Sequence, residues 1–228
     1  MKMQRDWDER AAKNARFYVG TAQEEWSDEE FFASGEKDVQ AQILTDMTNI
    51  CRGKHPSKMR VLEIGCGAGR VTRALGAVFG EVYAVDVSGE MVRLARHAVR
   101  ELENVFIYRN NGADLSVIPV DGFDFAFSHL VFQHIPSREV IESYVREVYR
   151  VLRPGALFKF QVQGETKVEV EPGDTWVGVP FSELEVFGLA NQSGFEYRYR
   201  SGAGEQSFWN WFFKPTVGRG VSTRRWGK

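Results

Sequence analysis

The chain has 228 residues, of which 43% are hydrophobic, and its 29 basic and 31 acidic side chains leave a net charge of −2 at pH 7. This composition excludes an intrinsically disordered chain, and the balanced charge argues against a protein that binds nucleic-acid phosphates. No apolar run approaches the roughly 18 residues of a membrane span, and the first residues lack a signal-peptide core. With two cysteines and no disulfide framework, we expect a cytoplasmic protein without nucleic-acid or membrane partners.

Residues 1–58 carry helix signals and no strand pattern, and we expect them to form an N-terminal helical cap region. Ser27 and Glu30 have the S-x-x-E spacing of a capping box, so one helix should begin at Ser27. A second helix is expected from about Lys37 to Ile50, where apolar residues recur near a 3.6-residue period.

From Met59 onward the chain alternates between short apolar runs and amphipathic segments. The expected strands are 61–64, 82–85, 105–108, 123–130, 156–162, 195–200 and 206–213. The expected helices are 70–79, 88–100, 137–152 and one that begins at Ser182. Strands that alternate with helices of about 10–15 residues indicate β-α-β units and a mainly parallel sheet. The last two strands have only a short link between them and must be antiparallel, because parallel neighbours need a long crossover.

A glycine-rich run, Glu63-Ile64-Gly65-Cys66-Gly67-Ala68-Gly69-Arg70, joins the first expected strand to the following helix. Glycines at such a junction let a ligand approach main-chain N–H groups at the positive end of the helix. Asp86 ends the second expected strand, where a carboxylate can accept hydrogen bonds from the hydroxyl groups of a ribose. The combination predicts a nucleoside-containing cofactor at the carboxyl ends of the strands.

The spacing of the glycines narrows the class of cofactor that the loop can be expected to bind. The dinucleotide fingerprint G-x-G-x-x-G requires a third glycine where this chain has Arg70. The run E-x-G-x-G-x-G followed by Val82-Tyr83-Ala84-Val85-Asp86 instead resembles the class I S-adenosylmethionine-dependent methyltransferases of small-molecule type. Further segments that resemble this family are 111–115 (NGADL), 122–126 (GFDFA) and 151–155 (VLRPG).

The resemblance covers about residues 59–163. It implies a Rossmann-like three-layer α/β/α sandwich, whose seven-stranded, mainly parallel sheet has a reversed terminal strand. The methyltransferase domain would occupy residues 59–215, between the helical cap (1–58) and a basic C-terminal tail (216–228).

The resemblance also implies S-adenosylmethionine as cofactor, and we expect no metal. The residues implied to hold the cofactor are Glu63, Gly65, Cys66, Gly67, Gly69, Asp86, Val87, Met91, Gly112, Asp114 and Ser128. Asp86 would bind the ribose, Asp114 would accept a hydrogen bond from the adenine amine, and Glu63 would order the glycine loop, directly or through water.

The acceptor would lie against the loop that follows the strand at 123–130. This loop lacks the [DN]-P-P-[YF] sequence of the family's DNA adenine methyltransferases and offers His129 and His134 instead. Both are candidate catalytic residues, and His134 is the candidate base for an acceptor hydroxyl. The candidate substrate-binding residues are Tyr18, Phe132 and Trp176.

We therefore expect a methyltransferase that acts on a small organic acceptor, with oxygen slightly favoured over nitrogen. An NAD(P)-dependent oxidoreductase, a non-catalytic cofactor-binding protein and a methyltransferase with a tRNA or protein acceptor are the alternatives. The sequence leaves the acceptor and the oligomeric state open.

Overall fold

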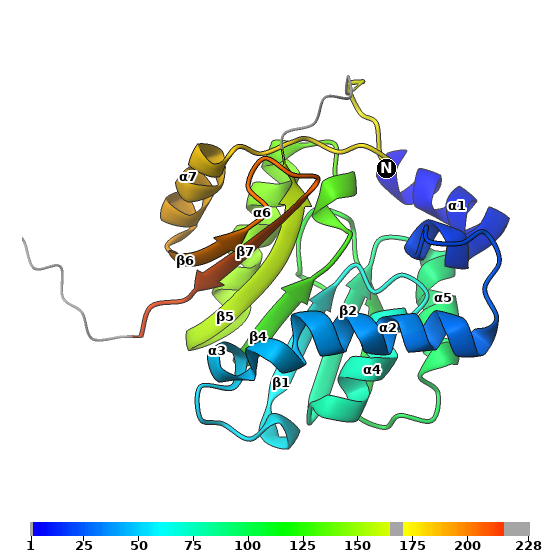
Figure 1. Ribbon diagram of the computed structural model, residues 1–228, viewed down its shortest axis with the longest axis horizontal. Helices are drawn as coiled ribbons and strands as arrows, with labels where there is room; N and C mark the ends of the chain where they lie inside the picture. The colour runs from blue at the N-terminus through cyan, green and yellow to red at the C-terminus, as the bar shows by residue number, and fades with distance from the viewer. Residues whose placement is uncertain (1, 165–170, 217–228) are drawn as a thin grey trace, which may run out of the picture.

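The computed structural model describes residues 2–164 and 171–216, and its centre is a seven-stranded sheet in the order β3-β2-β1-β4-β5-β7-β6 (Figure 1). The strands are β1 (Arg60–Ile64), β2 (Glu81–Asp86), β3 (Val105–Arg109), β4 (Phe123–Ser128), β5 (Leu152–Gln163), β6 (Glu196–Ser201) and β7 (Ser207–Phe213). Neighbouring strands are parallel except that β7 runs antiparallel to both β5 and β6. The mainly parallel sheet with a reversed strand at the end of the chain is confirmed.

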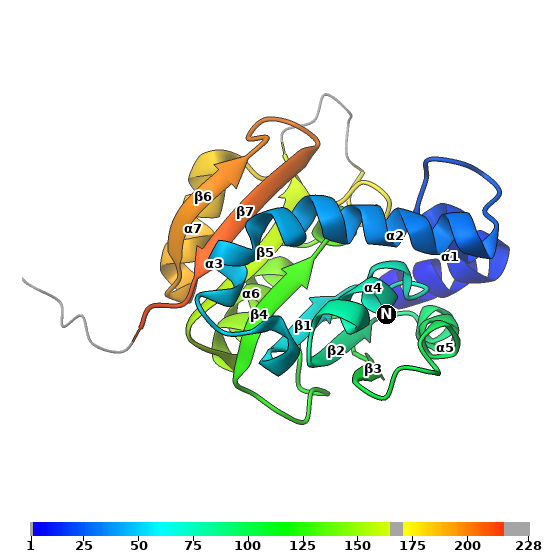
Figure 2. The same cartoon turned by 60° about the horizontal axis from the view of Figure 1, so that its bottom comes forward.

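Helices cover both faces of the sheet (Figures 1 and 2). They are α1 (Lys2–Val19), α2 (Asp28–Gln42), α3 (Met47–Cys51), α4 (Arg70–Val78), α5 (Gly89–Ala98), α6 (Arg138–Val151) and α7 (Glu183–Ser193), with short 3-10 turns at η1 (Leu44–Asp46), η2 (Pro56–Lys58) and η3 (Phe132–His134). None of the helices in the described ranges is long and apolar enough to cross a membrane.

The central strands β1, β2, β4 and β5 are buried on both faces, and their successive side chains enter different cores. In β1, Val61 packs in the cluster with Val39 of α2 and Leu75 of α4, whereas Leu62 packs in the cluster with Val145 of α6 and Val186 of α7. This period of two, with apolar partners on each side, explains why the strands read as short, nearly continuous apolar runs. The three-layer α/β/α arrangement is confirmed.

The helical region at the N-terminus differs from the expectation. Ser27 forms the expected capping box with Glu30, but α2 continues to Gln42, so the expected second helix from Lys37 does not exist as a separate element. The residues after Ile43 form only η1 and the five-residue helix α3. The buried Lys159 ammonium on β5 donates to the Gln42 carbonyl at 2.5 Å and so satisfies one of the carbonyl groups that the end of the helix leaves without a partner.

Helix α1 carries an apolar residue at every fourth position (Met3, Trp7, Ala11, Ala15 and Val19), and of these only Ala11 is fully buried. It is interrupted at Asn14, where the backbone is extended and the side-chain oxygen accepts a hydrogen bond from the Phe17 N–H at 3.1 Å. Asn14 thus acts as an internal cap that restarts the helix. The regular spacing of the apolar residues was a signal for this helix that the sequence analysis did not use, whereas the interruption at Asn14 has no such periodic signal.

Two strand bounds differ from the expected ones by two residues or more, and the others by one residue at most. β5 begins at Leu152 and not at 156, because Leu152 pairs with Phe123 and the Gly155 N–H donates to the Lys214 carbonyl. β4 ends at Ser128 and not at 130, since Leu130 adopts a left-handed backbone with φ +58°. Residues 217–228 of the expected basic tail lie outside the described residues.

Close packing of α2 on α4 depends on Gly35. A Cβ atom at this position would lie 2.1 Å from the Arg70 carbonyl oxygen, which is backbone and cannot move aside cheaply. We predict that Gly35→Ala lowers the free energy of unfolding by about 1–3 kcal/mol, the usual cost of overpacking, in urea denaturation. Gly188→Ala in α7 is the control, because no atom lies within 4 Å of its Cβ position and alanine favours the helix. A fully stable Gly35→Ala protein would contradict this packing.

Candidate active site

The glycine loop begins directly after β1. Gly65, Gly67 and Gly69 all have positive φ angles, of 77°, 52° and 86°. The N–H groups of Gly65 and Cys66 donate to the Val85 carbonyl of β2 at 2.8 and 3.0 Å, which turns the chain sharply towards α4. Glycine is required here because only it adopts these angles without a steric penalty.

Asp86 joins this loop to the next helix. One carboxylate oxygen accepts the Gly67 N–H at 2.8 Å, and the other accepts the Ser88 N–H at 2.9 Å, at the first turn of α5. Ser88 in turn caps α5 by accepting the Met91 N–H. The carboxylate therefore sets both the shape of the glycine loop and the start of α5.

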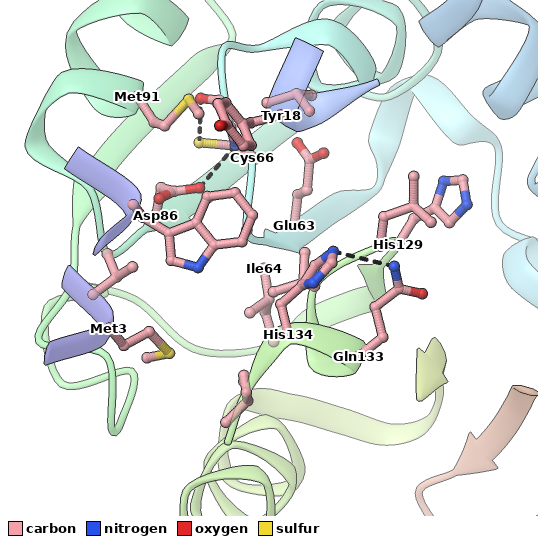
Figure 3. A pocket seen from close by; sticks show the side chains of 18 of the residues that line it. Met3, Tyr18, Glu63, Ile64, Cys66, Asp86, Met91, His129, Gln133 and His134 are labelled. Atoms are coloured by element: carbon pink, nitrogen blue, oxygen red, sulfur yellow. Dashed lines mark hydrogen bonds between the residues drawn. The ribbon is translucent and has the colours of Figure 1, made fainter. Parts of the chain in front are cut away.

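A cavity of about 470 Å³ opens at the carboxyl ends of β1, β2 and β4 (Figure 3). This is where open α/β sheets bind ligands. The residues expected from the sequence that line it are Tyr18, Glu63, Gly65, Cys66, Gly67, Asp86, Val87, Met91, His129, His134 and Trp176. The structure thus brings both candidate histidines and the glycine loop to one cavity.

Gly69, Gly112, Asp114, Ser128 and Phe132 do not line this cavity. Gly69 faces α5, where a Cβ atom would lie 3.1 Å from the Ala95 Cα. Asp114 closes its own turn, accepting the Ser116 N–H at 2.9 Å and the Asn111 amide at 2.9 Å.

Two of these residues belong to the interior. Phe132 is fully buried and packs against Tyr144 and Phe160, so the expected substrate contact is replaced by a core contact. Ser128 is also buried and donates to the Ile64 carbonyl at 3.1 Å, which ties β4 to β1.

Sequence reasoning missed several lining residues. Asn110 follows β3 and lies in the cavity wall, where its amide donates to the Tyr144 hydroxyl at 2.6 Å. The sequence did contain a signal for Asn110 as a lining residue, because it lies directly before the 111–115 segment. Met3 and Trp7 also line the cavity but come from α1, and nothing in the sequence places that helix here.

Helix α1 and the segment 171–181 together form a roof over the cavity. Arg10 donates to the Thr175 hydroxyl at 3.0 Å, and this hydroxyl donates to Asp6 at 2.8 Å. On the opposite side of α1, Asp8 accepts the Ser88 hydroxyl at 2.6 Å. These contacts join the roof to the start of α5.

Aromatic rings cover the inner surface of the roof. The His134 ring stacks on Trp176 with centroids 5.1 Å apart, and the Trp7 ring meets His134 edge-on at 5.3 Å. Tyr18 contacts Trp176 at 5.6 Å from the other side. The roof therefore offers a flat, largely apolar surface opposite the glycine loop.

Charged groups meet at the loop end of the cavity. Glu63 is 4% exposed, and burial raises its pKa to about 7. Burial likewise raises the pKa of Asp86 to about 6, although its hydrogen bonds oppose the shift. Within the described ranges, Glu63 Oε2 and Arg70 Nε are buried without a hydrogen-bond partner, while Arg70 pairs with Asp38 of α2 at 2.6 Å.

Both histidines are neutral at pH 7. Burial lowers the pKa of His129 and of His134 to about 4 in each case. His129 lies beside Trp209, with ring centroids 5.0 Å apart, and its Nδ1 is 3.5 Å from the Asp38 carboxylate. The structure describes no cluster of His, Cys, Asp and Glu in 2–164 and 171–216 that could hold a metal ion.

Comparison with known proteins agrees with this geometry. Residues 62–160 match the family model described as "Methyltransferase domain". These residues belong to that family. They form a class I S-adenosylmethionine-dependent methyltransferase domain, as the motif spacing indicates.

Individual relatives are more distant. The chain is 33% identical over 141 residues to "Sterol methyltransferase-like 3" of Botryococcus braunii, a match that covers 58% of this chain and 34% of that protein. It is 26% identical over 149 residues to the mitochondrial "Ubiquinone biosynthesis O-methyltransferase" of Rattus norvegicus, covering 64% and 41%. The matches therefore span about a third to two fifths of these relatives.

The methyltransferase domain also has solved structural neighbours. Magnesium protoporphyrin IX methyltransferase from Synechocystis PCC 6803, crystallised with bound SAH, superposes with a TM-score of 0.68 over 92% of this chain and 97% of that one. The sequence identity is 15%, so this likeness concerns the fold.

The role of Asp86 in cofactor binding can be tested by comparison with Asp114, an acidic residue that lies outside the cavity. We predict that Asp86→Ala weakens the binding of S-adenosylhomocysteine by about 1.5–3 kcal/mol, the range of a hydrogen bond to a charged group. Asp114→Ala is the control and should leave the affinity within about twofold, since Asp114 does not line the cavity. Isothermal titration calorimetry measures both, and equal losses would contradict the placement of the site.

The raised pKa of Glu63 has a consequence for stability. An unfolded glutamate loses its proton near pH 4.5, whereas the folded one keeps it to about pH 7, so the unfolded state binds fewer protons in this interval. The wild-type protein should therefore lose stability as the pH rises from 4.5 to 7. We predict that Glu63→Gln removes this loss and gains on the order of 1–3 kcal/mol over wild type between pH 4.5 and 7. Urea unfolding at several pH values checks the prediction, and a difference independent of pH would contradict it.

Proposed function

We propose that the protein transfers a methyl group from S-adenosylmethionine to a small organic acceptor, with an oxygen atom as the preferred nucleophile. One observation carries the proposal: a single cavity joins the glycine loop and Asp86 to the aromatic roof and His134. Its volume of about 470 Å³ is within the range of small-molecule sites.

The residues present fit the cofactor. Asp86 is placed at the strand end where a ribose would lie, and Met91 and Val87 offer apolar surface for an adenine beside it. The unpaired Glu63 oxygen and the unpaired Arg70 nitrogen have the charges that an α-ammonium and an α-carboxylate group need. Two buried polar atoms without partners would be costly in an apolar cavity, and such a ligand would satisfy both.

The cofactor supplies an activated methyl group on a positively charged sulfur, and the chain must orient the acceptor. Transfer requires the nucleophile in line with the methyl–sulfur bond, which is a matter of proximity and exclusion of water. The rings of Tyr18, Trp176 and Trp7 supply flat faces for this purpose. They favour an acceptor with a planar apolar part.

The preference for oxygen rests on His134. A neutral imidazole can take a proton from an acceptor hydroxyl, and burial keeps this ring neutral at pH 7. The similarity to a relative named as an O-methyltransferase supports the same preference. In the present structure the His134 Nε2 contacts the amide of Gln133 at 3.1 Å, and an acceptor hydroxyl would take the place of that amide.

Cofactor class is tested by calorimetry. S-adenosylhomocysteine should bind, while NAD and NADP should not, because Arg70 replaces the third glycine of the dinucleotide fingerprint. Preferential binding of NAD or NADP would overturn the proposal in favour of an oxidoreductase. Binding without turnover on a panel of phenols, carboxylic acids and amines would leave a non-catalytic binding protein.

The base is tested with two substitutions at one position. We predict that His134→Ala lowers turnover by about 10²–10⁴-fold, the usual contribution of a positioned base, and leaves cofactor affinity within a few-fold. His134→Phe keeps an aromatic ring against Trp176 but removes the lone pair, so it should lose as much turnover as alanine does. A His134→Phe enzyme with near wild-type turnover would show that the ring acts by packing alone.

A further inference from the structure

Two buried glutamines connect the centre of the sheet to His134. Gln161 on β5 donates its amide to Gln133 Oε1 at 2.6 Å, and Gln133 Nε2 lies 3.1 Å from His134 Nε2. On the far side of the ring, His134 Nδ1 lies 2.6 Å from the Trp176 carbonyl oxygen. Gln161 is 1% exposed and Gln133 is 7% exposed, so water does not compete freely for these bonds. Figure 3 shows the contact between Gln133 and His134 at the cavity wall.

At the Gln161 end of this series of hydrogen bonds, a backbone N–H group sets which atoms donate and which accept. The Leu130 N–H can only donate, and it donates to Gln161 Oε1 at 3.3 Å. The Gln161 nitrogen therefore faces Gln133, which must present its oxygen to it. The Gln133 nitrogen is then left facing His134 Nε2. Because an amide nitrogen donates and does not accept, His134 Nε2 must carry a lone pair.

The contact with Trp176, at the other end of the series, independently leads to the same assignment of the His134 ring hydrogen. The Trp176 carbonyl can only accept, so His134 Nδ1 must carry the hydrogen. Both ends of the chain thus specify the same neutral form of the ring, the Nδ1–H tautomer.

Backbone contacts hold both ends of this series of hydrogen bonds in place. The Gly178 N–H donates to the Gln133 carbonyl at 2.8 Å, and the Val179 N–H donates to the Ile135 carbonyl at 3.1 Å. A Cβ atom at Gly178 would lie 2.6 Å from the Ile135 oxygen, which shows how closely the two backbones pack. At the other end, Gln161 pairs with Trp209 in the centre of the β5–β7 ladder.

From this arrangement we infer that Gln133 and Gln161 are positioning residues that hold His134 as its Nδ1–H tautomer, with Nε2 available only as a hydrogen-bond acceptor. Gln133 occupies Nε2 until another donor replaces it. If the proposed function holds, that donor is the acceptor hydroxyl, and the ring is already in the one form that can receive its proton. The inference about the tautomer rests on the hydrogen bonds alone.

Protonation of His134 would oppose this arrangement. A second ring hydrogen at Nε2 would point at the amide hydrogens of Gln133, in addition to the cost of burying a cation. Two charged groups face the ring: Arg10 on α1, which lowers the pKa, and Asp174 on the roof segment, which raises it. With burial the larger influence, the ring stays neutral over the physiological range.

The test is nitrogen-15 NMR of the full chain labelled at its four histidines, with His134 assigned by its loss in His134→Phe. In the wild-type protein we expect Nδ1 to show the shift of a protonated nitrogen and Nε2 that of an unprotonated one. We expect no titration of this ring near pH 6.5, the ordinary value for histidine. A mixture of tautomers, the Nε2–H form, or ordinary titration of this ring would overturn the inference.

A substitution at Gln161 then tests the relay, by which we mean the series of hydrogen bonds from Gln161 through Gln133 to His134. Gln161→Leu removes the donor that orients Gln133, so the Gln133 amide can turn its oxygen towards Nε2 and accept from a protonated ring. The proton affinity of His134 should rise at least tenfold, about one pKa unit. Ser207→Ala is the matched control, because it removes the other acceptor of the Gln161 amide, at 3.2 Å, and leaves the orientation of Gln133 intact. An unchanged titration in a folded Gln161→Leu protein, or an equal shift in Ser207→Ala, would overturn the relay.

These readouts separate the inference from the proposed function. If the tautomer and the titration behave as expected but no acceptor is methylated, the relay stands and the proposed reaction fails. If methylation occurs with a ring that titrates ordinarily, the reaction stands and the relay fails.

Discussion

The half-buried carboxylate of Asp86 is the contact on which the rest of the site depends. It accepts from the Gly67 N–H and from the Ser88 N–H, so it fixes the glycine loop and the start of α5 at once. The Ser88 hydroxyl then holds Asp8 of α1. One side chain at the end of β2 thereby links the floor of the cavity to its roof. Its burial is costly, as its raised pKa shows, and a ligand that donates to it would repay part of that cost.

The roof encloses an apolar space above the carboxyl ends of the strands. Helix α1 packs Ala11 and the half-buried Trp7, Ala15 and Val19 in one apolar cluster, and polar contacts with Thr175 and Ser88 hold its two sides. Its interruption at Asn14 lets the helix change direction, so that Trp7 and Tyr18 both reach the cavity. The side chains of α1 other than Ala11 are half-buried or exposed, whereas those of the central strands are buried. We therefore expect the roof, rather than the sheet, to move when ligands enter.

Features of the site that depend on nearby residues could be predicted from the sequence, and features that depend on distant ones could not. The glycine loop and Asp86 lie at strand ends whose apolar pattern is strong, so their place at the cavity follows from local spacing. Asp114 shows the limit: it lies in a segment that resembles the family, but its side chain bonds within its own turn. The contact of Trp7 with His134 joins segments 127 residues apart in the chain, and no local pattern encodes it.

The electrostatics of the cavity indicate which ligand charge it accepts. Among the described lining residues, Glu63 and Asp86 carry carboxylates and Arg70 carries a guanidinium, whose Nη1 pairs with Asp38 while its Nε has no partner. Both histidines are held neutral by burial and add no positive charge. Such a cavity favours a ligand with net positive charge, because each buried carboxylate gains a counter-charge in a medium of low dielectric constant. S-adenosylmethionine carries a sulfonium and an ammonium group against one carboxylate, and transfer of the methyl group removes the sulfonium charge. If Glu63 and Asp86 hold the cofactor as proposed, they attract the product less, which favours its release after each turnover.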